Sequence, residues 1–572
     1  MKKYIYSIAL FFVVITFSAC DDFFNPDTNE ILPESEYVGS YDELYSGYMG
    51  IAASVQTVAD QASFLEGLRG DLLEPTSNAG REVWDVYNHE SLDGNSFASP
   101  VGYYNIIMNA NDYLEHVFEY REVNPTVLSD DDYEGLIGGV IRYKVWAYLM
   151  LAKIYGEAVY FDDALTSYQD ISNYPVLNFD QIIEKCRSLM IDGENGVDGL
   201  GTIKWSTELF PNQSASATNL MWDRICPPSE CLLAEIYLYQ NKFQKAWEQC
   251  VSIIKNGGEQ EASYQLNLSE YNGEWKQFGY TFVRKEQICV MFYDYSLKQT
   301  NRYIQYYSNT YPNEYILRPT EVAMDRFANQ KTSANIAGDK YRGSGITYKY
   351  VNSDWVLEKF LLGNETSDKI YTNDVQISLY RAAEIHMFLV ESLIGLGRFE
   401  EALAFLNDGV GSYYNATVGK FNAPFEDYPS CLYQTSSTSE KANRGIRGRV
   451  DLAKVGEFAL TSATALDTLV NMRRLDSLIV EETSLELAGE GKAFYAMNRM
   501  ARRWSTTSDK SWAQQWIDET GSANPGNLWG IDVQNVWAEK IGAKYTNGKG
   551  AAVTSELESS LDNWFIKYDL SE

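Results

Sequence analysis

The sequence predicts a mainly α-helical fold in which tetratricopeptide-like helical hairpins support an irregular, loop-rich face. Apolar residues recur three and four positions apart over 141–155 and again over 379–396, as they do in amphipathic helices. A similar order of residues around 235–246 and 384–402 indicates that one kind of hairpin occurs twice. Segments rich in Gly, Asn, Ser and Tyr separate the helical regions, and long segments of this kind tend to carry function.

The first residues are typical of a lipoprotein signal. A basic start and an apolar run over 5–17 lead to two small residues and then to Cys20. We expect residues 1–19 to be removed and Cys20 to carry acyl chains that hold the protein to a membrane. Residues 20–36 are polar, and we expect them to form a tether between the lipid anchor and the body of the protein. The later sequence offers no apolar stretch long enough to span a bilayer, so we expect membrane contact through the anchor alone.

Two helices are predicted most directly by their periodicity. The first covers 141–155 and is expected to end at Gly156, and the second covers 379–396 and is expected to end at Gly397. His386 falls on the apolar side of the second helix. We therefore expect a buried, hydrogen-bonded histidine there and not a metal ligand.

The repeated hairpins share a turn signal. A residue tolerant of left-handed backbone, Asn241 or Gly397, ends one helix, and an aromatic residue, Phe243 or Phe399, opens the next. Small and aromatic residues at such offsets are how tetratricopeptide-type hairpins pack. The period is irregular, which indicates separate hairpins and not a continuous array.

The remaining chain is expected to form one domain over 37–572. Its helical scaffold is predicted over about 37–255 and 376–410, with loop-rich and C-terminal parts between and after. The irregular segments share a richness in polar and small residues; they are 256–320, 330–375, 411–465 and 503–560.

Composition excludes several classes of function. The chain has 47 Lys and Arg against 79 Asp and Glu, a net charge of -32, which argues against binding nucleic acid. It has only 3 histidines, and its cysteine spacings match no zinc pattern, so we expect neither a metal centre nor a cofactor, and mostly buried free thiols. Its 42 tyrosines exceed what burial alone requires, and such rings at a surface suit sugars or peptides.

No catalytic motif stands out. The sequence lacks a nucleophile elbow, a zinc-protease helix and a phosphate-binding glycine loop. A carboxylate pair for glycoside hydrolysis stays open, because acidic residues are plentiful and none is singled out. The acidic run over 192–198 fits a solvated turn better than a calcium loop.

Four motifs resemble those of a known family. They are Cys20-Asp21-Asp22-Phe23-Phe24, the helix over 141–157, the segment from Ser378-Leu379-Tyr380-Arg381-Ala382-Ala383-Glu384 to Asn407, and the group Glu482, Glu486, Glu490, Phe494 and Arg499. On these residues the chain resembles the SusD/RagB family of outer-membrane nutrient-binding lipoproteins over nearly its whole length.

The resemblance implies a fold and a role. Tetratricopeptide-like helix pairs would scaffold an irregular ligand-binding face. The protein would be lipid-anchored in the outer membrane, facing the cell exterior. It would capture an oligosaccharide or polysaccharide without catalysis and deliver it to a SusC-type TonB-dependent transporter.

The resemblance also implies where a ligand lies. The corresponding loops are 78–87 and a mid-chain stretch that runs from 271 to 311. Aromatic rings would stack on sugars while amide and guanidinium groups read hydroxyls. The expected ligand residues are Asn78, Arg81, Trp84, Tyr87, Tyr271, Trp275, Tyr295, Tyr306 and Tyr307.

Three other functions stay open on the sequence. The same architecture could bind peptides, since tyrosine-rich loops suit either ligand. The chain could be a tetratricopeptide adaptor that assembles surface machinery without a small ligand. It could also be a glycoside hydrolase on a helical scaffold.

Overall fold

The fold was analysed in a computed structural model of the 572-residue chain. The structure describes residues 40–165, 171, 173–192, 199–203, 224–255, 264, 266, 286–294, 297–299, 301–361, 375–433, 443–461, 464–504 and 533–568. Cys20 and most of the acidic run over 192–198 lie outside these ranges.

Helices make up most of the described chain, which confirms the predicted fold class. The principal ones are α3 (Tyr41–Gln56), α4 (Ala59–Arg69), α5 (Arg81–Tyr87), α6 (Val101–Val123), α7 (Asp130–Tyr155), α8 (Phe179–Ile191), α10 (Ser229–Tyr239), α11 (Phe243–Lys255), α13 (Tyr303–Tyr307), α14 (Glu321–Ala328), α15 (Ala382–Gly395), α16 (Phe399–Leu406), α17 (Ala465–Glu486), α18 (Ala493–Arg503), α20 (Val533–Gly542) and α21 (Lys549–Ser559).

The described strands form small antiparallel pairs. They are β1 (Leu73–Pro75) with β5 (Leu317–Pro319), β2 (Glu157–Val159) with β3 (Val176–Asn178), β4 (Gln287–Tyr293) with β8 (Val375–Arg381), β6 (Tyr348–Val351) with β7 (Asp354–Leu357), and β9 (Tyr414–Asn415) with β10 (Lys420–Phe421). Several of these pairs join segments far apart in sequence, so they tie the loop regions to the helices.

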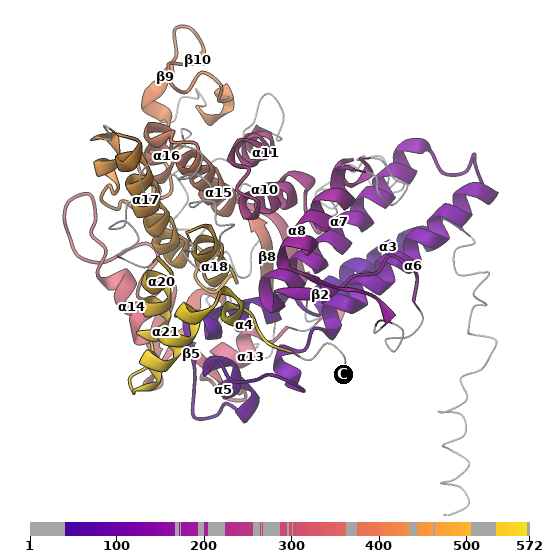
Figure 1. Ribbon diagram of the computed structural model, residues 1–572, viewed down its shortest axis with the longest axis horizontal. Coiled ribbons are helices and arrows are strands. Elements are labelled where there is room, and N and C mark those ends of the chain that lie inside the picture. Colours follow the sequence, from indigo (N-terminus) through magenta and orange to yellow (C-terminus); the bar gives the residue numbers. More distant parts are fainter. Residues whose placement is uncertain are drawn as a thin grey trace, which may run out of the picture.

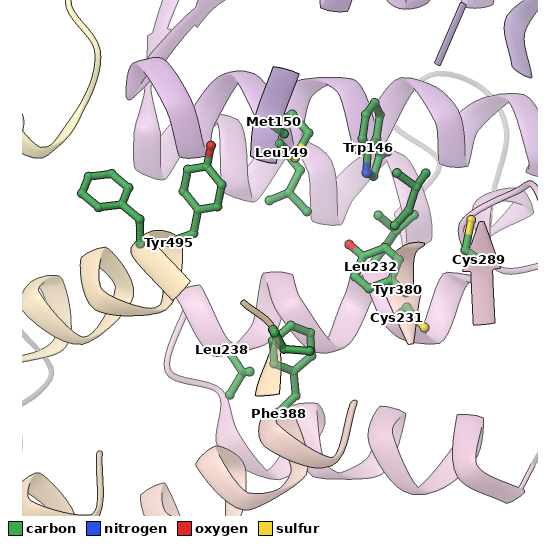
Figure 2. Packing of buried hydrophobic residues seen from close by; sticks show 14 of the residues in the cluster. Trp146, Leu149, Met150, Cys231, Leu232, Leu238, Cys289, Tyr380, Phe388 and Tyr495 are labelled. Atoms are coloured by element: carbon green, nitrogen blue, oxygen red, sulfur yellow. The ribbon is translucent and has the colours of Figure 1, made fainter. Parts of the chain in front are cut away.

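The helices pack in a continuous succession. The long helices α3, α6, α7 and α8 lie at one end, α10 and α11 follow, and α15 to α18 lie at the other end (Figure 1). Side chains from α7, α10, β8 and α15 meet in one hydrophobic core, as Figure 2 shows for Trp146, Leu149, Leu232, Tyr380 and Phe388. None of the helices that are described combines the length and apolarity that a membrane span requires.

Local sequence signals explain where α7 begins and ends. The Ser129 side chain accepts a hydrogen bond from the Asp132 N–H at 3.1 Å, and three aspartates occupy the first turn. The Ser129 side chain satisfies a free N–H group of the first turn. The aspartates interact favourably with the positive end of the helix dipole. At the other end Gly156 adopts φ 75°, a left-handed conformation that glycine takes without strain. The predicted helix and its stop are confirmed.

The two predicted hairpins are also confirmed. Asn241 (φ 55°) separates α10 from α11, and Gly397 (φ 72°) separates α15 from α16. The hairpins pack against each other through a small residue and a ring, because a Cβ at Gly395 would lie 2.4 Å from the Phe243 ring. Glycine therefore lets α15 approach α11 closely.

The start of the second predicted helix is wrong by three residues. Leu379 lies in strand β8, and α15 begins only at Ala382. Arg381 has extended backbone (φ -142°, ψ 166°) and pairs across the strands with Gln287. Strand pairing with a distant segment thus overrides a local helical pattern.

The C-terminal part is more helical than predicted. Helices α17 and α18 extend the scaffold, since α17 packs against α15. Helices α20 and α21 pack together within a region that we expected to be irregular. By contrast, the described parts of 411–461 contain only short strands and short helices.

His386 and the described cysteines are core residues. The His386 Nδ1 lies 2.8 Å from the Ala382 carbonyl oxygen, and its Nε2 lies 3.0 Å from the Asn443 Nδ2. Burial lowers the pKa of His386 to about 4, so the ring is neutral at physiological pH. All six described cysteines are buried and free.

Candidate functional site

The loop before α5 is fastened to a segment more than two hundred residues away. The Thr76 N–H donates to the Ile316 carbonyl oxygen at 2.9 Å, and the Asn78 side-chain amide donates to the Glu314 carbonyl oxygen at 3.0 Å. The neighbouring strands β1 and β5 pair in the register Glu74 to Arg318. Residues 314–318, which follow the second predicted ligand segment, thus lie beside the start of the first.

A third segment, the β6–β7 hairpin, completes this region. The Tyr315 hydroxyl donates to the Trp355 carbonyl oxygen at 2.6 Å, and the Asn309 amide donates to the Val351 carbonyl oxygen. The hairpin turns at Asn352 and Ser353, whose positive φ angles of 47° and 70° suit a tight two-residue turn.

Each of the three segments carries an exposed aromatic ring. Trp84 on α5 is 37% exposed, Tyr311 in the loop after α13 is 87% exposed, and Tyr350 on β6 is 58% exposed. Tyr350 contacts Trp355 with ring centroids 5.1 Å apart at 67°. We call the surface built by residues 73–88, 309–319 and 348–357 the aromatic face. Helices α5 and α13 and strand β5 lie together at the lower edge of Figure 1.

Charged groups brace the aromatic face. The Arg318 guanidinium contacts the Glu74 carboxylate at 2.7 Å and the Asp354 carboxylate at 3.0 Å, and so joins β1, β5 and β7. Arg81 lies on α5 with its side chain 92% exposed, and its Nε is 3.4 Å from the Asp85 carboxylate. Arg81 can therefore turn toward a ligand without leaving a buried charge behind.

The structure describes six of the nine predicted ligand residues. Asn78, Arg81 and Trp84 lie on the aromatic face. Tyr306 is half-buried and packs against Phe64, with ring centroids 5.1 Å apart. Tyr271, Trp275 and Tyr295 lie outside the described residues, so their roles stay predictions.

Tyr87 and Tyr307 belong to the core and not to the surface. The Tyr87 ring packs between Trp84 and Tyr545, with centroids at 5.8 Å and 4.9 Å, and the Lys544 ammonium lies 4.5 Å from its centre. Tyr307 is fully buried among other rings, among them Phe360. Neither ring offers a face to a ligand, and we correct both assignments.

The ligand residues predicted from the sequence did not include Tyr350 or Trp355, which the β6–β7 hairpin brings to the aromatic face. A signal for them exists in the alternation of Tyr348, Tyr350 and Trp355 around the Asn-Ser pair, which is typical of a short hairpin. That pattern predicts a hairpin with aromatic residues but not its place against strand β5 and the loop before it. Only the contacts with residues 309–318 bring it there.

A cavity elsewhere, lined by several charged side chains, is too small to be a sugar site. It lies among α7, α10, α15, α17 and α18, has a volume of about 20 Å³, and is lined in part by Lys153, Glu235, Glu384, Lys492 and Arg499. That volume holds about one water molecule, whereas ligand pockets span about 300 Å³ or more.

The carboxylates of this cavity are engaged in buried ion pairs. Lys153 lies 2.7 Å from Glu235, and Lys492 lies 2.9 Å from Glu384. Burial alone would raise the pKa of Glu235, but Lys153 and Lys492 outweigh it and lower this pKa to about 2. These carboxylates are structural and have no access to a polymer. Among the described residues, no group of three or more His, Cys, Asp or Glu side chains could hold a metal ion.

Comparisons with known proteins identify the fold. No protein-family profile and no curated protein matches the chain. Solved structures do match. A SusD superfamily protein from Bacteroides vulgatus ATCC 8482 has a TM-score of 0.55 at 15% identity, covering 86% of this chain and 95% of that one.

Two further structures agree. A SusD superfamily protein from Bacteroides thetaiotaomicron VPI-5482 has a TM-score of 0.50 at 15% identity, covering 84% of this chain and 93% of that one. A SusD-like carbohydrate binding protein from Bacteroides vulgatus ATCC 8482 has a TM-score of 0.51 at 13% identity, covering 81% of this chain and 83% of that one. These likenesses extend over most of each chain, and the chain therefore has the fold of the SusD superfamily.

Proposed function

We propose that the protein binds a glycan on the aromatic face and does not cleave it. The observation that carries the proposal is the presence of three exposed rings, Trp84, Tyr311 and Tyr350, on adjoining segments of a SusD fold. One protein of this fold is described as carbohydrate binding, which supports the same ligand class here.

The chemistry of the face suits sugars. The rings offer flat apolar surfaces to the C–H faces of pyranoses, and exposed tryptophan and tyrosine do so at little conformational cost. The Arg81 guanidinium and the Asn352 amide lie on the same segments and can exchange hydrogen bonds with hydroxyl groups. Such a surface can bind and orient a polymer.

The test is binding of the purified protein and its ring variants to a panel of polysaccharides and peptides. We expect Trp84→Ala and Tyr350→Ala each to weaken glycan binding about fivefold or more, because each removes about 1 kcal/mol of ring contact. Phe118→Ala is the matched control, since Phe118 is 36% exposed but lies on α6.

Four other outcomes of this binding test would each change the proposal. Glycan binding that is unchanged in both ring variants would place the ligand elsewhere. Sugar products in the supernatant would restore the hydrolase alternative. Binding to peptides alone would replace the glycan by a peptide, and binding to neither would favour the adaptor.

We further propose that the bound glycan is delivered to a SusC-type TonB-dependent transporter. This rests on the fold together with the sequence resemblance. The test is co-purification from the native membrane: a large barrel protein recovered with the wild-type chain supports the partnership, and recovery of the chain alone contradicts it.

The proposed location is the outer membrane, facing the cell exterior, with Cys20 as the lipid anchor. Mass spectrometry of the purified protein tests the anchor. We expect a mature chain that begins at Cys20 with acyl chains attached. Protease added to intact cells tests the orientation, since an external protein is cleaved and an internal one is protected.

A further inference from the structure

The charges of the aromatic face indicate which glycans it accepts. We propose that its ligand is a glycan without carboxylate or sulfate groups, so that uronic-acid polymers and sulfated polysaccharides are rejected. This inference rests on the proposed glycan-binding function and deepens it by naming the ligand class.

Each cation of the face has a carboxylate near it. Its three segments contain Arg81, Arg318 and Lys349. Arg318 is bound by two carboxylates, those of Glu74 and Asp354, in the pairs described above. Arg81 has Asp85 at 3.4 Å, and Lys349 has Glu358 at 3.4 Å. An anionic sugar would have to displace a carboxylate to reach Arg318, and at the exposed Arg81 it would meet the Asp85 carboxylate one helical turn away.

The carboxylates of the same segments outnumber the cations. They are Glu74, Glu82, Asp85, Glu314 and Asp354, five against three. Glu314 is exposed three residues after Tyr311, and Glu82 is exposed on α5 two residues before Trp84. Hydrogen bonds from the Ser96 hydroxyl at 2.7 Å and the Ser96 N–H at 3.1 Å hold Glu82 in place. These bonds lower the pKa of Glu82 and so keep it ionised.

The physical consequence is repulsion of anions at contact distance. Proteins that recognise carboxylate or sulfate present an arginine fork whose hydrogen bonds are available. Here the described part of the face presents an excess of negative charge, and the whole chain adds a net charge of -32. Repulsion of this kind acts within about 8–10 Å at physiological salt and weakens as salt is added.

The experiment compares each neutral polysaccharide with its own charged derivative. The purified protein is first tested on an array that contains neutral, uronic-acid and sulfated glycans. Each neutral glycan that binds is then carboxymethylated, and both forms are measured by calorimetry at about 20 mM and about 300 mM NaCl.

The expected result has two parts. Array binding is confined to glycans without acidic groups, and carboxymethylation weakens binding about tenfold at about 20 mM NaCl, with most of that loss recovered at about 300 mM. The affinity of the neutral form changes less than about twofold over the same range.

A charge variant links the effect to this face. Glu82→Gln combined with Glu314→Gln should raise the affinity for the carboxymethylated glycan at least about threefold at about 20 mM NaCl, and more than it changes the affinity for the neutral form. Glu119→Gln, which removes an exposed charge near the far end of α6, is the control and should change neither.

Two results overturn the inference in different ways. Array binding to a uronic-acid or sulfated glycan that weakens with salt refutes the ligand class and leaves glycan binding intact. Absence of binding to every glycan on the array refutes the proposed function itself, and the ligand class with it.

Discussion

At the level of single residues, Glu66 is buried in α4 with one strong hydrogen bond. Its Oε1 accepts from the Phe494 N–H at 2.8 Å, while the side chain is 2% exposed. Burial raises the pKa of Glu66 to about 7, and the Asp71 carboxylate adds to this effect. The folded protein therefore favours the protonated acid over a range of pH where the unfolded chain is ionised.

This residue predicts a pH-dependent stability. As pH rises from about 4.5 to about 7, the unfolded state loses this proton first, so the free energy of unfolding falls by up to about 3 kcal/mol. Glu66→Gln should remove that part of the slope, which denaturant titrations over the same pH range measure. Glu119→Gln is the exposed control. A slope that is unchanged in Glu66→Gln would assign the loss to other groups.

In the candidate site, the types of residue were predicted better than the exposure of each side chain. Trp84 and Arg81 were identified from a polar loop, and the structure places both at the surface. Tyr87, three residues after Trp84, is also aromatic. It is buried because Lys544 and Tyr545, which come near the C-terminal end of the sequence, cover its ring. No local pattern reports such a long-range contact.

At the level of elements, the hairpins depend on close helix approach. Gly395→Ala should destabilise the protein by about 1–3 kcal/mol, because the added methyl group meets the Phe243 ring. Gly50→Ala in α3 is the matched control. Nothing lies within 4 Å of its Cβ position, so it should stabilise the helix by about 0.5–1 kcal/mol. Equal shifts in thermal unfolding for the two variants would contradict this packing.

The family-like motifs in the second half of the chain are structural. Arg381 at the end of β8 contacts Glu286 and Glu490 at 2.7 Å and Glu486 at 2.9 Å. Arg342 joins the same network, with Glu486 at 2.8 Å. The network ties β8 to α17 and to the loop after α14. Burial of each of these charges requires the others as partners.

Breaking this network should be costly. Arg381→Met leaves the carboxylates of three glutamates with one cation fewer in the core, and we expect a loss of about 3–5 kcal/mol in the free energy of unfolding. The control is Arg187→Met. Its partners Glu184 and Asp192 are largely at the surface, so its loss should stay below about 1 kcal/mol. A loss below about 1 kcal/mol for Arg381→Met as well would rule out a stabilising role for the network.

At the level of the whole molecule, the net charge of -32 opposes compactness. Added NaCl screens the exposed charges more than the buried ion pairs. We expect the melting temperature to rise by about 1–3 °C between about 20 mM and about 300 mM NaCl. Scanning calorimetry measures this. A fall over the same range would mean that exposed ion pairs outweigh the net repulsion.

The sequence by itself determined the helix over 141–155 with its stop and the two hairpins, because these depend on apolar periodicity and on residues such as Gly156 and Asn241 that tolerate left-handed backbone. The tertiary structure decided which rings are exposed and where α15 begins. Exposure of Trp84 but not Tyr87, the position of the β6–β7 hairpin and the extended backbone of Arg381 all follow from contacts between segments distant in sequence. Such contacts depend on how the whole chain packs, and local patterns carry no record of it.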